Sequence, residues 1–264
     1  MSKVKPGFNV TIVSGALLDN QSMLEKFVHD FAHHRDRGHA LVHGGGEEAD
    51  KFIKKLDMPI CKVNGNRITD ERTLAEITMV FTALNGKLIR LLDKDAGESY
   101  HCKEYVGMPL WGAIAGSKKK PKTNGTDYGL VGRVEPEDIT EDTLDTIKDG
   151  FIPVMSPITY DFGRKLWLNS KSNFIAASLA VRLSGEYDVN LRFYSSVMGV
   201  RLGRGQGELV PEINEGLFNE LRRENMLTPN MVQKLEAGFY ALNLGVGKVS
   251  ITNTFAERGT ALAR

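Results

Sequence analysis

The segment Leu41-Val42-His43-Gly44-Gly45-Gly46 carries the strongest local signal about the fold. Its first half belongs to a short apolar run at 40–43, which predicts a buried strand. Three consecutive glycines follow, and a helical pattern begins directly after them, over about 47–56. Glycines let backbone N–H groups approach an anion closely, and the N-terminus of a helix adds partial positive charge. The segment therefore predicts either an anion-binding turn or a tight strand-to-helix turn that binds no ligand.

Short apolar runs alternate with helical patterns on both sides of this segment. The strands that these runs predict lie at 10–13, 40–43, 152–155, 189–194 and 249–252. The predicted helices lie at 22–32, 47–56, 70–92, 140–149, 172–183, 214–224 and 228–244. Strands separated by helical crossovers are typical of a parallel sheet with helices on both faces. We therefore expect an α/β protein, a three-layer α/β/α sandwich whose open, mainly parallel sheet is continuous through two lobes.

Several residues mark the predicted ends of helices and the turns between strands. Ser172 is a good N-cap for the helix over 172–183, and Thr228 followed by Pro229 marks another helix start. The dipeptide Asn64-Gly65 is typical of a two-residue hairpin turn. Residues 93–105 are expected to form a loop, and the lysine-rich segment 117–127 an exposed hairpin or loop.

Composition and charge exclude several classes of protein. The chain has 264 residues, with 34 Lys and Arg against 33 Asp and Glu, so its net charge is +1. A net charge this small gives no overall electrostatic field that would attract nucleic acid or an anionic membrane. The longest uncharged run, 6–18, is too short to span a bilayer. Because Cys61 and Cys102 are the only cysteines, we expect no disulfide framework and a reducing cytosol. Because His33 and His34 have no Cys or His partners at metal-ligand spacing, we expect no zinc site and assign no metal ligands.

A second motif, Asn64-Gly65-Asn66-Arg67-Ile68-Thr69, places an arginine on the predicted hairpin just before the longest predicted helix. A guanidinium can bind a carboxylate through two parallel N–H bonds. Arg67 is therefore a candidate for binding a carboxylate of a small ligand. The alternative is a solvated surface arginine, because most arginines in proteins are exposed.

These two motifs occur together with four others in a fixed order along the chain. The further motifs are Asp127-Tyr128-Gly129-x-Val131-Gly132, Ile152-Pro153-Val154-Met155-Ser156-Pro157, Met231-x-x-Lys234-Leu235 and Gly259-Thr260. In this order the chain resembles the N-acetylglutamate kinases, which belong to the amino acid kinase family. The triple glycine and Asn-Gly-x-Arg occur together in the acetylglutamate kinases. Uridylate kinases and aspartate kinases share the fold but lack this pair of motifs, so the resemblance is to the acetylglutamate kinases.

The resemblance implies a fold, a reaction and a different ligand for each of the two lobes. It implies an N-terminal lobe, about 1–165, that binds an acylated amino acid, and a C-terminal lobe, about 166–264, that binds ATP with the Mg²⁺ that the nucleotide carries. The implied reaction transfers a phosphoryl group from ATP to the side-chain carboxylate of N-acetyl-L-glutamate, or of another N-acyl-glutamate, in arginine biosynthesis. We also expect a cytoplasmic protein that forms a homodimer or a higher homo-oligomer and binds neither nucleic acid nor membrane.

The resemblance also implies roles for individual residues. The backbone N–H groups of Gly45 and Gly46 would surround the substrate and the transferring phosphoryl group, with Gly45 in a catalytic role. Arg67 would bind the α-carboxylate of the substrate, and Asn169 would be a second substrate-binding residue. Lys234 would offset negative charge in the transition state and contact the nucleotide. The remaining positions assigned to the nucleotide site are Gly15 and Ser196.

At several positions the chain departs from the family pattern. Ile12 stands where the family has a phosphate-binding lysine, and Ser14 replaces a glycine. Asn173 stands where the family has the aspartate that organises the lysines, and Ser196 replaces a charged residue near the nucleotide. Pro229-Asn230 replaces a glycine pair. The alternative function is therefore a kinase-like protein that binds an acyl amino acid or nucleotide without efficient transfer, unless a residue such as Lys171 restores the missing charge.

Overall fold

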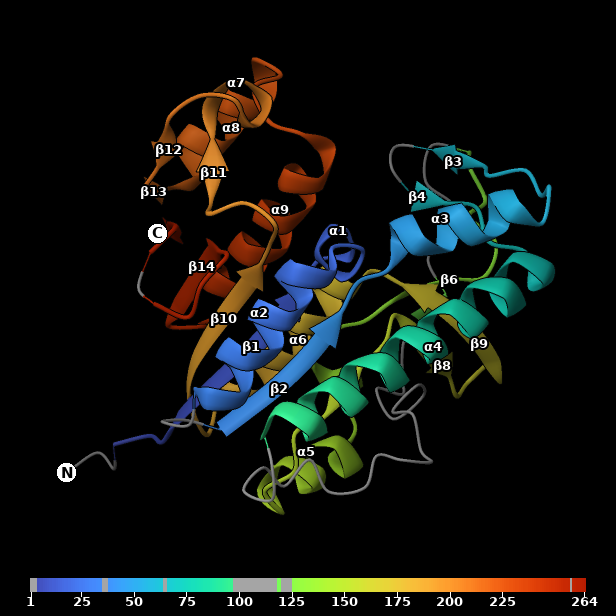
Figure 1. Cartoon of the computed structure of the whole chain (residues 1–264), viewed down its shortest axis with the longest axis horizontal. Coiled ribbons are helices and arrows are strands. Elements are labelled where there is room, and N and C mark those ends of the chain that lie inside the picture. Colours follow the sequence, from blue (N-terminus) through green and yellow to red (C-terminus); the bar gives the residue numbers. More distant parts are fainter. Residues whose placement is uncertain (1–3, 35–37, 64–65, 97–117, 120–124, 257) are drawn as a thin grey trace.

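The computed structural model describes residues 4–34, 38–63, 66–96, 118–119, 125–256 and 258–264. Central strands lie between helices that cover both faces (Figure 1). The proposed hairpin turn Asn64-Gly65, most of the loop expected at 93–105, and the middle of the segment 117–127 lie outside the described residues.

The central sheet has seven strands in the order β13-β15-β14-β10-β1-β2-β7. Neighbouring strands run parallel except β14 and β15, which are antiparallel. The strands are β1 (Gly7–Val13), β2 (Gly38–His43), β7 (Val154–Met155), β10 (Asp188–Tyr194), β13 (Glu212–Ile213), β14 (Lys248–Thr252) and β15 (Thr260–Leu262). The expected mainly parallel α/β architecture is therefore confirmed.

The five strands expected from the sequence all belong to this one sheet, so the expected continuous sheet is confirmed. The other strands pair among themselves. A four-stranded sheet has the order β5-β6-β9-β8, and two more pairs are β3-β4 and β11-β12. These strands are β3 (Lys62–Val63), β4 (Asn66–Arg67), β5 (Lys118–Lys119), β6 (Val131–Arg133), β8 (Ile158–Asp161), β9 (Leu166–Ser170), β11 (Val200–Arg201) and β12 (Leu209–Val210). The division into lobes near residue 165 stays a prediction, and β9 pairs with β6 and β8.

Alternate residues of the central strands supply two different cores, which creates the three layers. Val10 and Ile12 of β1 belong to a core with α6 (Ser172–Leu183) and α9 (Pro229–Asn243). Val13 belongs to a core on the other face, with α2 (Gln21–His33) and α4 (Glu71–Ala96). The shorter helices are α1 (Gly15–Leu18), α3 (Gly46–Lys55), η2 (Pro136–Asp138), α5 (Glu141–Lys148), α7 (Leu202–Gly205) and α8 (Glu215–Arg223).

Most helix ends agree with the capping residues in the sequence, with two exceptions. The Thr228 side chain accepts a hydrogen bond from the backbone N of Met231, and Pro229 is the first residue of α9. The prediction of Ser172 as an N-cap is wrong. The extended residue Lys171 is the N-cap of α6, because its carbonyl accepts the first helical hydrogen bond, from Ile175. Helix α4 also continues to Ala96, beyond its expected end at 92.

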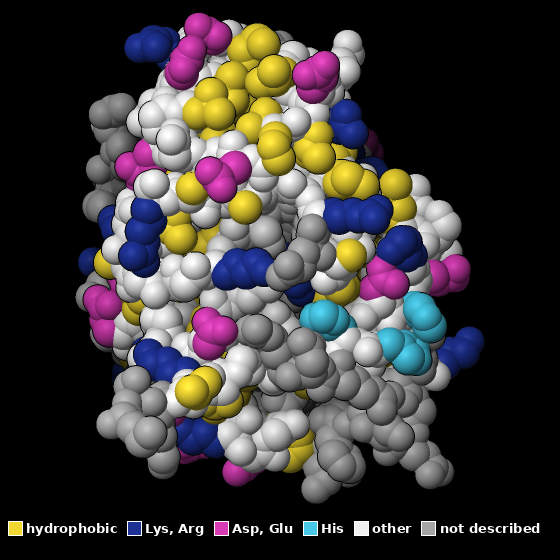
Figure 2. Space-filling view, turned by 90° about the vertical axis from the view of Figure 1, so that its left-hand side faces the viewer, with side chains coloured by type: hydrophobic (Ala, Val, Ile, Leu, Met, Phe, Trp, Pro, Cys, Tyr) yellow, Lys and Arg dark blue, Asp and Glu magenta, His cyan; other side chains and the backbone are white. Residues whose placement is uncertain are grey.

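The surface shows the mixture of charges expected from the composition. On the face drawn in Figure 2, basic and acidic side chains alternate, and hydrophobic side chains gather toward the top, the end at which Figure 1 places α7 and α8. Within the described part of the chain, no helix combines the length and apolarity needed to cross a membrane.

Three parallel strands end together at one edge of the central sheet. Val13, the last residue of β1, is paired with His43 of β2 and with Tyr194 of β10. The chain leaves these strands through Ser14–Gly15, Gly44–Gly46 and Ser195–Ser196. In open α/β sheets, ligands bind beside the carboxyl ends of the strands. This edge is therefore where the fold favours a site.

Candidate active site

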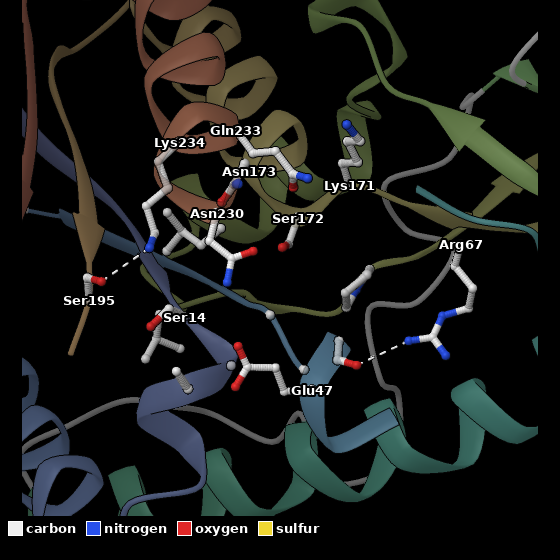
Figure 3. A pocket seen from close by; sticks show the side chains of 18 of the residues that line it. Ser14, Glu47, Arg67, Lys171, Ser172, Asn173, Ser195, Asn230, Gln233 and Lys234 are labelled. Carbon is white, nitrogen blue, oxygen red and sulfur yellow. Dashed lines mark hydrogen bonds between the residues drawn. The ribbon is translucent and has the colours of Figure 1, made fainter. Parts of the chain in front are cut away.

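A cavity of about 400 Å³ opens at this edge of the sheet. Its walls come from the ends of β1, β2 and β10, from the first turns of α1, α3, α6 and α9, and from β4 and β9. Figure 3 shows Arg67 at one end, Lys234 and Ser195 at the other, and Glu47 between them. All the sequence-assigned site residues line this cavity: Gly15, Gly45, Gly46, Arg67, Asn169, Ser196 and Lys234.

Two glycine-containing turns touch each other on the floor of the cavity. A Cβ on Gly15 would lie 3.2 Å from the backbone N of Gly45. Gly45 has φ 148°, and a Cβ there would lie 2.7 Å from Leu84 and 3.0 Å from Phe81, so only glycine fits without strain. A Cβ on Gly46 would meet no atom within 4 Å. The backbone of Gly46 is therefore accessible from the cavity.

His43 is a buried, neutral ring that supports the glycine turn. Its Nδ1 lies 2.7 Å from the carbonyl of Gly44, and its Nε2 lies 3.3 Å from the Nδ2 of Asn85. Asn85 in turn donates to the carbonyl of Val154, at 2.8 Å. These partners require Nδ1 to donate and Nε2 to accept. Burial lowers the pKa of His43 to about 4, so the ring is neutral at physiological pH.

Arg67 is a buried guanidinium fixed by two contacts to α3. Its Nη2 donates to the carbonyl of Gly46 at 3.1 Å and forms an ion pair with Oδ1 of Asp50 at 2.8 Å. Its Nη1 is buried and has no hydrogen-bond partner. Only 8% of the side chain is exposed, and burial lowers its pKa, while Asp50 opposes that shift. Arginine remains charged in proteins, so this guanidinium places a positive charge at this end of the cavity.

Asn169 is held beside Arg67 by contacts between residues far apart in the chain. Its Nδ2 donates to Oγ1 of Thr69 at 3.2 Å. Thr69 forms an isolated β-bridge with Gly129, whose φ is 71°. A Cβ on Gly129 would lie 2.2 Å from the carbonyl oxygen of Thr69, so this approach requires glycine. The amide of Asn169 thus faces the same end of the cavity as Arg67.

Lys234 lies at the opposite end, on the second turn of α9. Its Nζ donates to Oγ of Ser195 at 3.2 Å (Figure 3). Among the described ion pairs, none involves Lys234. Burial lowers the pKa of Lys234 from its usual 10.5 to about 8, although the negative charge of Glu47 opposes the shift. This ammonium is therefore poorly neutralised by the protein and attracts an anion.

Comparison with known proteins decides the family. A sequence model described as the Amino acid kinase family matches residues 9–253. This chain belongs to the amino acid kinase family. Acetylglutamate kinase of Bacteroides fragilis is 35% identical over 255 residues, which cover 95% of this chain and 93% of that protein.

Other relatives agree with this assignment. Acetylglutamate kinase of Cytophaga hutchinsonii is 34% identical over 246 residues, which cover 90% of this chain and 88% of that protein. The crystal structure of smu.665 from Streptococcus mutans superimposes with a TM-score of 0.77 at 22% identity, covering 97% of this chain and 98% of that one. The identity to this structure is too low to show more than a shared fold.

This amino acid kinase differs from the family pattern at positions that line its own cavity. Ile12, Ser14, Asn173 and Ser196 all belong to the wall. Ile12 is 3% exposed and packs in the core with α6 and α9. Lys171 also lines the cavity, but in Figure 3 its side chain points away from the space between Lys234 and Glu47. In this structure, therefore, Lys171 does not take the place of the missing lysine.

Sequence reasoning about this kinase missed several polar residues of the cavity, among them Asp50, Lys62, Glu47 and Ser195. Asp50 lies one helical turn after Gly46 and fixes Arg67, and Lys62 pairs with its second carboxylate oxygen. The spacing of four residues between Gly46 and Asp50 on the same helix was a usable signal for Asp50. Glu47 and Ser195 had no such signal, because their positions relative to Lys234 depend on the packing of α3, β10 and α9.

The described residues contain no preformed cluster of three His, Cys, Asp or Glu side chains suited to a metal ion. The oxygen-bearing side chains near the middle of the cavity are instead Glu47, Ser172 and Asn230 (Figure 3). Carboxylate, hydroxyl and amide oxygens suit Mg²⁺, which usually binds one or two carboxylates together with substrate phosphates. The residues present therefore fit a Mg²⁺ ion that arrives with a nucleotide.

Proposed function

We propose that this protein is an ATP-dependent kinase of the acetylglutamate kinase type, which phosphorylates the side-chain carboxylate of N-acetyl-L-glutamate or another N-acyl-L-glutamate in arginine biosynthesis. The observation that carries this proposal is the arrangement of the cavity. A buried arginine and an ammonium lie at opposite ends, with accessible glycine backbone between them. The acetylglutamate kinases that are about one-third identical over most of the chain support the same assignment.

At the substrate end, Arg67 would bind the α-carboxylate of the acyl amino acid. Its Nη2 is already committed to Gly46 and Asp50, which fixes the plane of the guanidinium. The positive charge of the guanidinium would attract the carboxylate of the ligand at this end of the cavity. Asn169 would orient the same ligand. This arrangement favours an amino acid with a free α-carboxylate and a second carboxylate directed toward the glycine turn.

Phosphoryl transfer requires positioning and electrostatic stabilisation more than covalent chemistry from the protein. The backbone N–H groups of Gly45 and Gly46 would bind the transferring group, and Lys234 would stabilise negative charge that develops on it. Gly15 and Ser196 would line the nucleotide side. When bound, Mg²⁺ supplies charge neutralisation of the phosphates, and Glu47, Ser172 and Asn230 are the residues placed to hold it.

A second candidate function is ligand binding with very slow transfer, and one observation favours it. Ile12 brings an apolar side chain to the cavity wall where the family pattern has a lysine, and Asn173 lacks the charge of the family aspartate. Each lost preorganised charge is expected to lower the rate about 10²–10³-fold. The expected cytoplasmic location and homo-oligomeric state stay predictions under both functions.

Trapping of the product with hydroxylamine tests the proposed function directly. Purified protein, MgATP and N-acetyl-L-glutamate should yield an acyl hydroxamate, because hydroxylamine captures the acyl phosphate. N-succinyl-L-glutamate should be assayed in parallel, and L-glutamate serves as the control without an acyl group. ADP release without hydroxamate would contradict acyl phosphate formation. The absence of both products, with both ligands bound, would establish the second candidate function.

Replacement of Arg67 with alanine should weaken the binding of N-acetyl-L-glutamate by about 1.5–3 kcal/mol, the range for a charged hydrogen bond. Isothermal titration calorimetry measures this loss. Arg72→Ala is the matched control, because Arg72 is an exposed arginine on α4 outside the cavity. Unchanged affinity in Arg67→Ala would show that Arg67 does not bind the substrate carboxylate.

A further inference from the structure

Glu47 places a negative charge at the centre of a cavity that is proposed to receive the phosphates of a nucleotide. It is the second residue of α3, directly after Gly46, and it lines the cavity. Figure 3 shows its carboxylate directed between Ser14 and Asn230, away from Arg67. No ion pair with Glu47 occurs among the described side chains, although its charge acts on Lys234. Glu47 therefore faces the proposed nucleotide end without a direct ion pair to a described side chain.

The balance of charge in the cavity makes this position unusual. The other acidic residue of the wall, Asp50, is paired with both Arg67 and Lys62. Of the two acidic side chains on the described wall, only Glu47 thus lacks an ion pair, while Lys171 and Lys234 also line the cavity. Polyphosphate carries several negative charges, and the Glu47 carboxylate repels it where the two lie close together. Without a cation, the phosphates of a nucleotide would therefore be repelled by Glu47.

A divalent cation changes the sign of this interaction. Mg²⁺ is typically bound by one or two carboxylates together with substrate phosphates, and keeps several waters. Glu47 offers a carboxylate, and Asn230 and Ser172 offer neutral oxygens around the same space. Glu47 also lies in the first turn of α3, where the helix N-terminus attracts negative charge. The same carboxylate that repels free phosphates would then hold a metal-bound nucleotide.

We propose that Glu47 is a protein ligand of the divalent cation that accompanies the nucleotide, and that it makes this cavity select metal-bound over metal-free ATP. This inference rests on the proposed function, because it requires ATP to bind in the cavity. It also gives this chain a source of positive charge near the phosphates that is independent of Ile12 and Lys171. The cation that Glu47 holds would occupy the functional place of a lysine side chain.

The test compares two forms of ATP in Glu47→Gln, which keeps the shape of the side chain and removes its charge. Calorimetry at pH 7 and fixed ionic strength would measure binding of MgATP and of ATP in the presence of EDTA. We expect the affinity for MgATP to fall about tenfold and the affinity for metal-free ATP to rise severalfold, because ligation is lost and repulsion is relieved. Opposite changes for the two forms are the signature of a metal ligand.

Glu71→Gln is the matched control. Glu71 is also an exposed glutamate in the first turn of a helix, but it lies outside the cavity, so neither affinity should change. Changes of the same sign for both forms of ATP in Glu47→Gln, or no change, would overturn the assignment of Glu47 while leaving the proposed kinase intact. If the unaltered protein bound neither form, the assignment of Glu47 and the proposed function would both be rejected.

Discussion

The double variant Ile12→Lys with Asn173→Asp is expected to raise turnover at least about 10²-fold, because one preorganised charge at a developing transition-state charge has about that effect. Both positions line the cavity, and α6, which carries Asn173, packs against β1, which carries Ile12. A new lysine at position 12 would therefore enter the cavity from the strand that ends at the glycine turns. The hydroxamate assay under saturating MgATP and N-acetyl-L-glutamate measures the gain.

The two substitutions must be made together. Ile12 is 3% exposed, and a lysine buried there without a partner would tend to lose its proton. The aspartate supplies that partner, so Ile12→Lys alone is the informative control and should gain much less. If the double variant folds and binds both ligands, yet turns over at the parental rate, then Ile12 and Asn173 do not limit catalysis. If the parent already turns over at ordinary kinase rates of about 1–100 per second, the hypothesis of impairment is wrong.

Replacement of Lys234 with glutamine should lower kcat about 10²–10³-fold in a protein that shows measurable transfer, since it removes a preorganised charge from the cavity. The side chain is half-buried against Ser195, and glutamine preserves most of its length and its ability to donate a hydrogen bond. The loss should therefore appear in kcat more than in stability. Lys54→Gln, on the exposed surface of α3, is the matched control for removal of one lysine.

The pH dependence of the parent gives a second readout for Lys234. Because burial lowers its pKa to about 8, the group is charged at pH 7 and loses its proton as the pH rises through 8. The ratio kcat/KM, which reports ionisations of the free enzyme, should therefore fall above about pH 8. In Lys234→Gln this alkaline decline should disappear. A decline that persists in the variant would assign it to another group.

Local sequence patterns were sufficient to predict the order and type of most elements. The apolar runs at 10–13, 40–43 and 189–194 became β1, β2 and β10, because fully buried parallel strands are apolar on both faces. Prolines, threonines and glycines marked several helix ends for the same local reason. Ser172 misled the prediction because capping depends on which carbonyl accepts the first helical bond, and in the folded chain that carbonyl belongs to Lys171.

By itself the sequence determined the alternating α/β pattern, the glycine turn at 44–46 and the residues that could bind a carboxylate or a phosphate. Only the tertiary structure decided which of them share one cavity. Asn169 meets Thr69 across 100 residues of chain, and Lys234 meets Ser195 across 39. Such contacts depend on how strands and helices pack against one another. The periodic pattern of apolar residues within a single element does not encode that packing. The same packing turned Arg67 toward Asp50 and directed Glu47 to the side of the cavity that holds Ser14 and Asn230.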